Sequence, residues 1–175
     1  RTFQNIALFK GMTVLENIQT GRCLMNKASV LSQAFRLAKS RREDDESREK
    51  AEELLEFLEI QAIRKTSVGQ LSYGLQKRVE LGRALAAEPK CLLLDEPMAG
   101  MSPDEKQDMT RFILQAKEAY GMTVVLIEHD LGVVMDISDH VIVLDYGRKI
   151  ADGIPEEIKR DQKVIDAYVG KNTDI

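Results

Sequence analysis

Two adjacent carboxylates follow a short apolar run in the second half of the chain. The segment reads Cys91-Leu-Leu-Leu-Asp95-Glu96-Pro97, which predicts a buried strand that ends in Asp95 and Glu96. Open α/β sheets place their ligands at such strand ends. Successive side chains of an extended segment point to opposite sides, so one carboxylate can face a hydrated Mg²⁺ and the other an attacking water. The pair indicates phosphoryl transfer, and the alternative is a strand that ends in two solvated acids.

A serine and a glycine open a helix shortly before that strand. The sequence Leu-Ser-Tyr-Gly-Leu-Gln at 71–76 leads into a helical segment that carries basic residues. The first turn of a helix presents unpaired N–H groups and a partial positive charge, and Gly74 permits close approach of the backbone. These features suit an anion such as a terminal phosphate. The alternative is that Ser72 is an ordinary N-cap.

The segments that must position these residues alternate between strand and helix. Apolar runs predict strands at 91–94, 124–127 and 141–144, and the intervening patterns predict helices at 104–119 and 131–137. Ser102, Pro103 and Glu105 form a capping-box pattern at the start of the first of these helices, and Gly121 stops it. The dipeptide Tyr146-Gly147 predicts a tight hairpin. Strands that alternate with helices imply a parallel α/β sheet.

The first half of the chain has a helical pattern instead. One apolar stripe lies between residues 30 and 38, and Ala51, Leu54, Leu55 and Leu58 form another. The mixed charge run at 41–46 between them is typical of a solvated connection or helix face.

Length and composition exclude several classes of protein. The 175 residues of 19.7 kDa suffice for one domain or part of a larger one, with 43% hydrophobic and 31% charged residues. A net charge of -4 leaves no basic surplus for nucleic acid. Cys23 and Cys91 form neither a disulfide framework nor a CxxC motif, which favours a reducing compartment. No apolar stretch approaches the ~20 residues that cross a bilayer.

The Ser-x-Gly turn, its basic helix and the apolar-Asp-Glu-Pro strand together resemble the signature motif and Walker B motif of ABC-type ATPases. Gln4 looks like the Q-loop of that family, and His129 in Glu-His-Asp resembles its switch histidine. His140 matches no family motif and is interpreted as structural. The resemblance implies an α/β fold of the P-loop NTPase type, with a parallel sheet and a helical subdomain, and it implies ATP and Mg²⁺ as cofactors.

The resemblance also implies a role for each matching residue. Asp95 and Gln4 hold Mg²⁺ through water, Glu96 polarises the attacking water, and His129 bonds the γ-phosphate. In trans, the ATP bound to the opposite subunit contacts the signature residues, which are Ser72, Tyr73, Gly74 and Gln76. Ser102 occupies the D-loop.

The chain departs from the family pattern at several places. Tyr73 replaces a glycine, Leu75 is altered, and Ser102 stands where many relatives carry Asp. No G-x-x-x-x-G-K-[ST] motif occurs. We therefore expect an N-terminally truncated copy that lacks the first strands and the phosphate loop, is inactive alone and is poorly soluble. The expected segments are the Q-loop segment 1–10, a helical subdomain 11–75, an α/β core 76–152 and a helical tail 153–175.

Further segments resemble one branch, the LivG-type ATPases of branched-chain amino-acid importers. They are Arg-Thr-Phe-Gln at 1–4, Met-Thr-Val-Leu-Glu-Asn at 12–17 and Ala-Tyr-Val-Gly at 167–170. This likeness implies transmembrane permease subunits, a second ATPase subunit in a homo- or heterodimer, and indirectly a substrate-binding protein. It implies a peripheral location on the cytoplasmic face of the plasma membrane, and no nucleic acid. Similar ATPases serve urea importers, so the cargo stays open.

Two other functions are open at this point. A non-catalytic module could dock a permease and complete the ATP site of a partner subunit in trans, and the missing phosphate loop favours it. ABC proteins that act on ribosomes or DNA usually carry two fused cassettes or long coiled-coil insertions, and this chain has neither.

Overall fold

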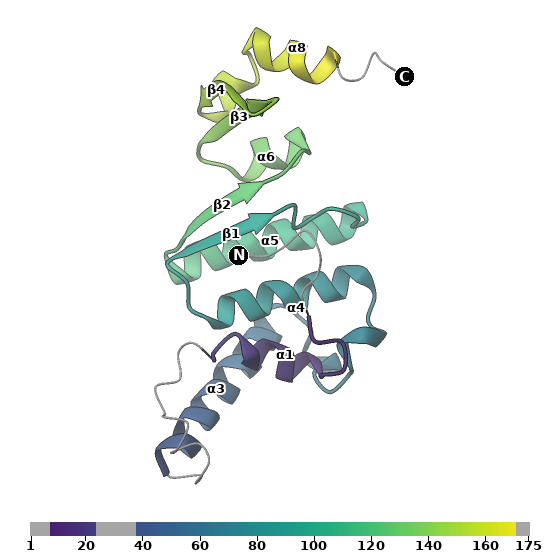
Figure 1. Cartoon of the computed structure of the whole chain (residues 1–175), viewed down its shortest axis with the longest axis vertical. Helices are drawn as coiled ribbons and strands as arrows, with labels where there is room; N and C mark the ends of the chain where they lie inside the picture. The colour runs from purple at the N-terminus through teal and green to yellow at the C-terminus, as the bar shows by residue number, and fades with distance from the viewer. Residues whose placement is uncertain (1–7, 24–37, 171–175) are drawn as a thin grey trace. The chain divides into compact units, whose positions relative to one another are not determined.

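The computed structural model describes residues 8–23 and 38–170, which belong to two compact units, Arg1–Ile127 and Glu128–Ile175 (Figure 1). The elements of the first unit are α1 (Val14–Thr20), α3 (Ala38–Phe57), the 3-10 turns η1 (Gln61–Ile63) and η2 (Val68–Gln70), α4 (Tyr73–Ala86), β1 (Cys91–Asp95), α5 (Pro103–Tyr120) and β2 (Thr123–Ile127). Those of the second are α6 (Leu131–Ile137), β3 (Val141–Asp145), β4 (Arg148–Gly153), α7 (Pro155–Ile158) and α8 (Gln162–Gly170). The four expected segments stay a prediction.

The parallel sheet is confirmed in the first unit. Strands β1 and β2 run parallel, with Cys91 opposite Thr123 and Asp95 opposite Ile127. Helix α5 connects them, as a parallel pair requires. Local signals fix the limits of this helix: Ser102 and Glu105 form a complete capping box, and Gly121 ends the helix in the left-handed conformation at φ 57°. The predicted α/β class is therefore confirmed.

Three helices of the first unit meet at a glycine. The stripe Ala51, Leu54, Leu55 and Leu58 is fully buried, as predicted. A Cβ built on Gly82 of α4 would lie 2.8 Å from Leu58 Cδ1 and 3.1 Å from Ile18 Cδ1. The glycine therefore lets α1 and α4 approach the C-terminal end of α3 closely. The predicted stripe between 30 and 38 lies almost wholly outside the described residues.

Helix α5 is tied to both of its helical neighbours through Phe112, which is fully buried. The Phe112 ring lies 6.0 Å from the Phe57 ring, and the guanidinium groups of Arg78 and Arg111 lie 5.2 Å and 4.4 Å from its centre. Arg78 pairs with Asp108, and Arg111 pairs with Glu59 just beyond α3 at 3.0 Å. These contacts join α3, α4 and α5 around one aromatic ring.

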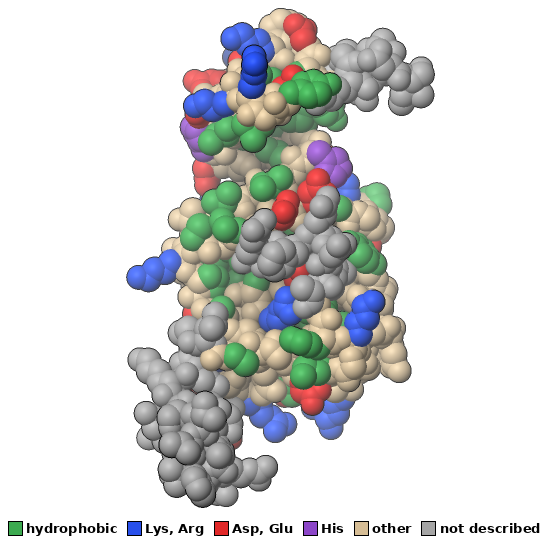
Figure 2. All heavy atoms as spheres, viewed as in Figure 1, with side chains coloured by type: hydrophobic (Ala, Val, Ile, Leu, Met, Phe, Trp, Pro, Cys, Tyr) green, Lys and Arg blue, Asp and Glu red, His purple; other side chains and the backbone are tan. Residues whose placement is uncertain are grey.

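Strand β1 is buried on one face and exposed on the other. Leu92 and Leu94 are 1% and 2% exposed, whereas Leu93 is 43% exposed. On β2, Val125 and Ile127 are 47% and 60% exposed. The predicted burial of β1 therefore holds for one of its two faces. Hydrophobic side chains also reach the surface elsewhere (Figure 2).

The second unit is built around an antiparallel hairpin. Strands β3 and β4 pair from Val141 opposite Gly153 to Asp145 opposite Arg148, with a register shift at Val143 and Leu144. The predicted Tyr146-Gly147 turn joins them, and both residues have positive φ. Its small core consists of Val141, Ala151, Ile158 and Val164. Among the helices of the described residues, none is both long and apolar enough to cross a membrane.

Candidate functional site

The end of β1 places Asp95 and Glu96 in different backbone conformations. Asp95 is the last residue of the strand, whereas Glu96 has φ 45°, in the left-handed region. The Glu96 N–H donates to the Ile127 carbonyl at 2.9 Å, and the Glu96 carbonyl accepts from the Ala99 N–H at 3.2 Å. The chain thus turns sharply at Glu96, and the extended pair that the sequence predicts is wrong at this residue. Both carboxylates are half-buried.

A left-handed glutamate is an informative feature of this turn. A residue with a Cβ is costly in that conformation and persists only where the surroundings hold it. Here the bond from the Glu96 N–H to Ile127 and the bond from the Ala99 N–H to the Glu96 carbonyl supply that restraint. Such restrained backbones are typical of functional sites. Glu59, Glu88 and Tyr146 share the left-handed conformation, so the conformation places Glu96 at a sharp turn and assigns it no role by itself.

The residues 96–102 form a loop between β1 and α5 that is packed at several points. Met98 and Met101 are 1% and 7% exposed, and the Met101 N–H donates to the Met98 carbonyl at 3.2 Å. Gly100 has φ 74°, which favours glycine at this position. We call this segment the β1–α5 loop, and Ser102 ends it as the N-cap of α5.

The N-cap interpretation of Ser72 is confirmed. Its Oγ accepts from the Leu75 N–H at 3.4 Å, at the start of α4. The Gln76 amide Nε2 donates to the Leu71 carbonyl at 2.9 Å, which closes the turn before the helix. Gly74 is buried and Tyr73 is 43% exposed. At 3.4 Å this capping bond is long and therefore weak.

The structure brings residues 71–76, which we call the signature turn, next to the β1–α5 loop. A Cβ built on Gly74 would lie 2.0 Å from Oε1 of Glu105, in the first turn of α5. A Cβ built on Gly100 would lie 3.3 Å from Cε1 of Tyr73. Ser72, Gly74 and Ser102 are each marked by a local sequence pattern, but no such pattern marks the contact between their segments. Nothing in a local pattern signals a contact between helix starts so far apart in the chain.

His129 does not lie in the same compact unit as the end of β1. His129 belongs to the second unit, is 73% exposed in its side chain and lies 3.8 Å from the Glu128 carboxylate through Nδ1. Gln4 lies outside the described residues. His140 Nε2 lies 2.6 Å from Asp152 Oδ1, across the hairpin of β3 and β4, which supports its structural interpretation.

The end of β1 suits a magnesium ion that is bound together with a nucleotide, but not one held by protein ligands alone. In the described part of the chain, no group of three or more His, Cys, Asp or Glu side chains could hold a metal ion. Magnesium that accompanies a nucleotide needs only one or two carboxylates, because phosphate oxygens and water fill the other positions. Asp95, half-buried at the end of a parallel strand, is suited to that role.

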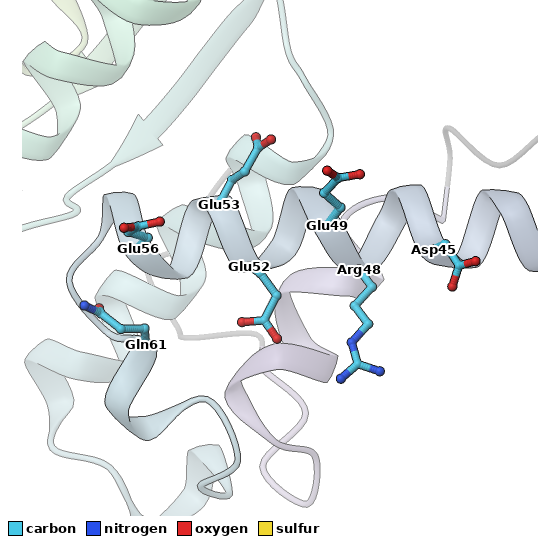
Figure 3. Close-up of a pocket in the computed structure, with 7 residues that line it drawn as sticks. All are labelled: Asp45, Arg48, Glu49, Glu52, Glu53, Glu56 and Gln61. Carbon is cyan, nitrogen blue, oxygen red and sulfur yellow. The ribbon is translucent and has the colours of Figure 1, made fainter.

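An acid-rich hollow of about 580 Å³ lies along α3 (Figure 3). Its lining residues are Asp45, Arg48, Glu49, Glu52, Glu53, Glu56 and Gln61. Five carboxylates against one guanidinium repel a polyphosphate. None of the predicted site residues lines this hollow, so it is not a nucleotide site.

Known proteins resemble the chain over nearly its whole length. The family model described as ABC transporter matches residues 1–99, and the model described as Branched-chain amino acid ATP-binding cassette transporter matches residues 148–173. The high-affinity branched-chain amino acid transport ATP-binding protein BraF of Pseudomonas aeruginosa is 40% identical over 98% of this chain and 67% of its own length. LivG of Escherichia coli, with a corresponding description, is 35% identical over the same shares of the two chains.

Solved structures agree with the sequence comparisons. A nucleotide-free ATP-binding cassette from an ABC transporter has a TM-score of 0.77 and 37% identity over 96% of this chain and 67% of its own. A cassette crystallised in the ADP conformation has a TM-score of 0.76, also at 37% identity, over 97% of this chain and 67% of its own. The chain thus spans about two thirds of these relatives. With its β1 carboxylates and its Ser-x-Gly helix start, the chain belongs to the ATP-binding proteins of the ABC transporter family.

Proposed function

We propose that the chain is the ATP-binding and ATP-hydrolysing part of an ABC importer that takes up branched-chain or related amino acids. The observation that carries the proposal is the 40% identity to BraF over 98% of the chain, with the second family model at its C-terminal end. The left-handed Glu96 beside Asp95 supplies the chemical support. Its partners would be transmembrane permease subunits and a second ATPase subunit, on the cytoplasmic face of the membrane, with a substrate-binding protein delivering the amino acid.

In this proposal the carboxylates at the end of β1 have separate tasks. Asp95 and Gln4 would hold Mg²⁺ through water, and the ion would supply charge neutralisation at the phosphates when bound. Glu96 would orient the attacking water and accept its proton. His129 would donate a hydrogen bond to the terminal phosphate. The left-handed turn supports this division, because it changes the direction of the chain between the two carboxylates.

The start of α4 would act on the nucleotide of the opposite subunit. The helix start and the Ser72 hydroxyl suit a terminal phosphate, since helix N-termini favour anions. Tyr73, Gly74 and Gln76 complete this signature turn. Ser102 would lie in the D-loop between the subunits.

The test uses the transporter assembled with its permease and partner ATPase subunits in proteoliposomes. Glu96→Gln keeps the size of the side chain but removes the base, so ATP binding should persist while hydrolysis falls roughly 10²–10⁴-fold. Glu118→Gln is the matched control, because it makes the same chemical change on an exposed residue of α5. Unchanged turnover in Glu96→Gln would contradict the proposal.

The same preparation decides between the alternatives. Uptake of labelled leucine but not urea would support the amino-acid cargo. If the wild-type chain binds the permease and stimulates the ATPase of its partner subunit without any turnover of its own, the non-catalytic module is the better description. Ser72→Arg should abolish turnover with nearly unchanged nucleotide affinity if the signature acts in trans.

A further inference from the structure

The N-termini of helices α4 and α5 lie beside each other, and the Glu105 carboxylate contacts both of them. Glu105 accepts the Ser102 N–H through Oε2 at 2.9 Å, and its own N–H donates to the Ser102 Oγ at 3.3 Å. Its other oxygen, Oε1, lies so near Gly74 that no Cβ fits at that position. The carboxylate therefore closes the cap of α5 and also packs on the first turn of α4, where the partial positive charge of the helix attracts it.

A second contact joins the same two segments. The Tyr73 ring lies over Gly100, where an added Cβ would be 3.3 Å from Cε1 and 3.8 Å from Cδ1. Gly100 sits in the middle of the β1–α5 loop with φ 74°, so a side chain there would strain the backbone and crowd the ring. The ring thus contacts the loop backbone directly, on the segment that begins at Glu96.

The ring is supported from inside the molecule. Lys77, one turn along α4, has a side chain only 2% exposed, and its Nζ lies 5.8 Å from the centre of the Tyr73 ring. Lys77 also pairs with the equally buried Glu80 at 3.6 Å. A buried ammonium with an ionic partner is costly to move. Tyr73 is therefore held between a fixed cation of its own helix and the backbone of the β1–α5 loop.

We propose that Tyr73 and Glu105 form a clasp that makes the signature turn and the β1–α5 loop one rigid piece. Tyr73 and Glu105 act on Glu96 as positioning residues in this assignment, while Tyr73 also belongs to the signature turn that would face the nucleotide of the opposite subunit. The clasp prevents the loop that carries Glu96 from moving relative to the N-terminus of α4, and so fixes the orientation of the Glu96 carboxylate. The inference rests on the proposed ATP hydrolysis for its consequence, because a nucleotide bound at the signature turn would then set the position of Glu96 in the same chain.

The first test measures amide hydrogen exchange in the assembled transporter and requires no turnover. The amides of Ala99, Met101 and Ser102 are all hydrogen-bonded within the loop or its cap. Tyr73→Ala should raise their exchange rates about tenfold or more, since the loop loses its outer restraint. Tyr73→Phe keeps the ring and should leave the rates unchanged.

Tyr120→Ala is the matched control for this test. Tyr120 is 41% exposed, close to the 43% of Tyr73, but it lies at the other end of α5 against Phe57. It should not change exchange in the β1–α5 loop. Equal exchange in wild type and Tyr73→Ala would overturn the clasp, as would equal acceleration by Tyr120→Ala.

The second test measures ATP hydrolysis. Tyr73→Ala should lower kcat roughly tenfold to hundredfold with little change in KM, because a displaced Glu96 misorients the water without weakening nucleotide binding. Tyr120→Ala, which lies outside the site, should keep the wild-type kcat. A KM effect alone, or an equal loss of kcat in Tyr120→Ala, would overturn the positioning role.

A double variant separates the clasp from direct contact with phosphate. Gly74→Ala should displace Glu105 from the Ser102 N–H, so Gly74→Ala and Glu105→Ala should act through one contact and the double variant should be no slower than the slower single variant. Fully additive losses would overturn the clasp. If wild-type transporter shows no turnover, the proposed function fails, and the exchange experiment still decides whether the clasp exists.

Discussion

Glu96 combines an unfavourable backbone with the position from which a carboxylate could activate water. A side chain in the left-handed region costs about 1–2 kcal/mol relative to the right-handed one. The loop hydrogen bonds hold this conformation in place. Its position at the end of a parallel strand, where α/β sheets place their ligands, is what supports the chemistry proposed for Glu96.

Glu96→Gly should therefore stabilise the fold while it removes the base. Glycine adopts φ 45° without a steric penalty, so we expect the free energy of unfolding to rise by about 0.5–1 kcal/mol relative to Glu96→Ala. Both variants lack the carboxylate, so their difference isolates the backbone term. Urea unfolding followed by circular dichroism measures it. A Glu96→Gly variant no more stable than Glu96→Ala would show that the turn is unstrained.

Asp152 makes the second unit sensitive to acid. Its carboxylate accepts from Lys149 Nζ at 2.7 Å and lies 2.6 Å from His140 Nε2. The lysine and then the histidine hold the pKa of Asp152 below its usual value of 3.8. The folded chain then binds fewer protons than the unfolded chain, so this contribution to stability is complete above pH 3.8 and is lost as the pH falls through the lower folded value.

Asp152→Asn should therefore flatten the loss of unfolding free energy in the acid range. The measurement is a series of urea unfolding curves from neutral pH to below the usual aspartate value. The effect should shrink in high salt, because all three groups are exposed. An unchanged slope with pH in the variant would show that the three charges do not contribute to folding.

At the scale of elements, helix packing in the first unit depends on the glycine at position 82. The contacts of Gly82 with Leu58 and Ile18 are shorter than a real Cβ allows or at its limit. Gly82→Ala should therefore push α4 from α1 and α3, and lower the free energy of unfolding by about 1–3 kcal/mol.

Gly132→Ala provides the matched control. Gly132 also lies in a helix, α6, but a Cβ there would meet only Asp130 Oδ1, at 3.4 Å. The variant should be neutral or stabilised by up to about 1 kcal/mol, since alanine favours a helix over glycine. Thermal and urea unfolding of the two variants tests the difference. Equal effects would mean that α4 has room for a methyl group.

At the scale of the whole molecule, exposed apolar side chains on β2 distinguish this chain from a closed α/β protein. Val125 and Ile127 alternate on one face of β2 at 47% and 60% exposure, and Leu93 of β1 is exposed next to them in register. Exposed apolar strands favour association with other chains. We expect the isolated chain to self-associate through this face.

Replacing Val125 and Ile127 together by threonine should reduce that association. Threonine keeps the preference for a strand but adds a hydroxyl to the exposed face. Light scattering of the isolated chain at increasing concentration measures the change. The control is Ile142→Thr on β3, which is 58% exposed in the other unit. If the control reduces association as much as the β2 variant, the β2 face is not responsible.

The sequence by itself determined those secondary-structure elements whose limits depend on interactions between residues close in the chain. The start of α5 follows from Ser102, Pro103 and Glu105, whose capping bonds span only three residues. Short continuous apolar runs predicted β1 and β2, and the Tyr146-Gly147 turn predicted the hairpin of the second unit. The Ser-x-Gly turn followed by the Asp-Glu pair was sufficient to indicate the family, because the order of motifs along the chain can be read without the tertiary structure.

Only the tertiary structure decided how these pieces meet. The left-handed turn of Glu96 depends on a bond to Ile127 of β2, and the one-sided burial of β1 depends on which face the rest of the unit covers. The contact of Gly74 with Glu105 arises from the packing of two helix starts. Such contacts join residues far apart in the chain, and their geometry is set by the sum of all packing in the unit, so no local pattern encodes them.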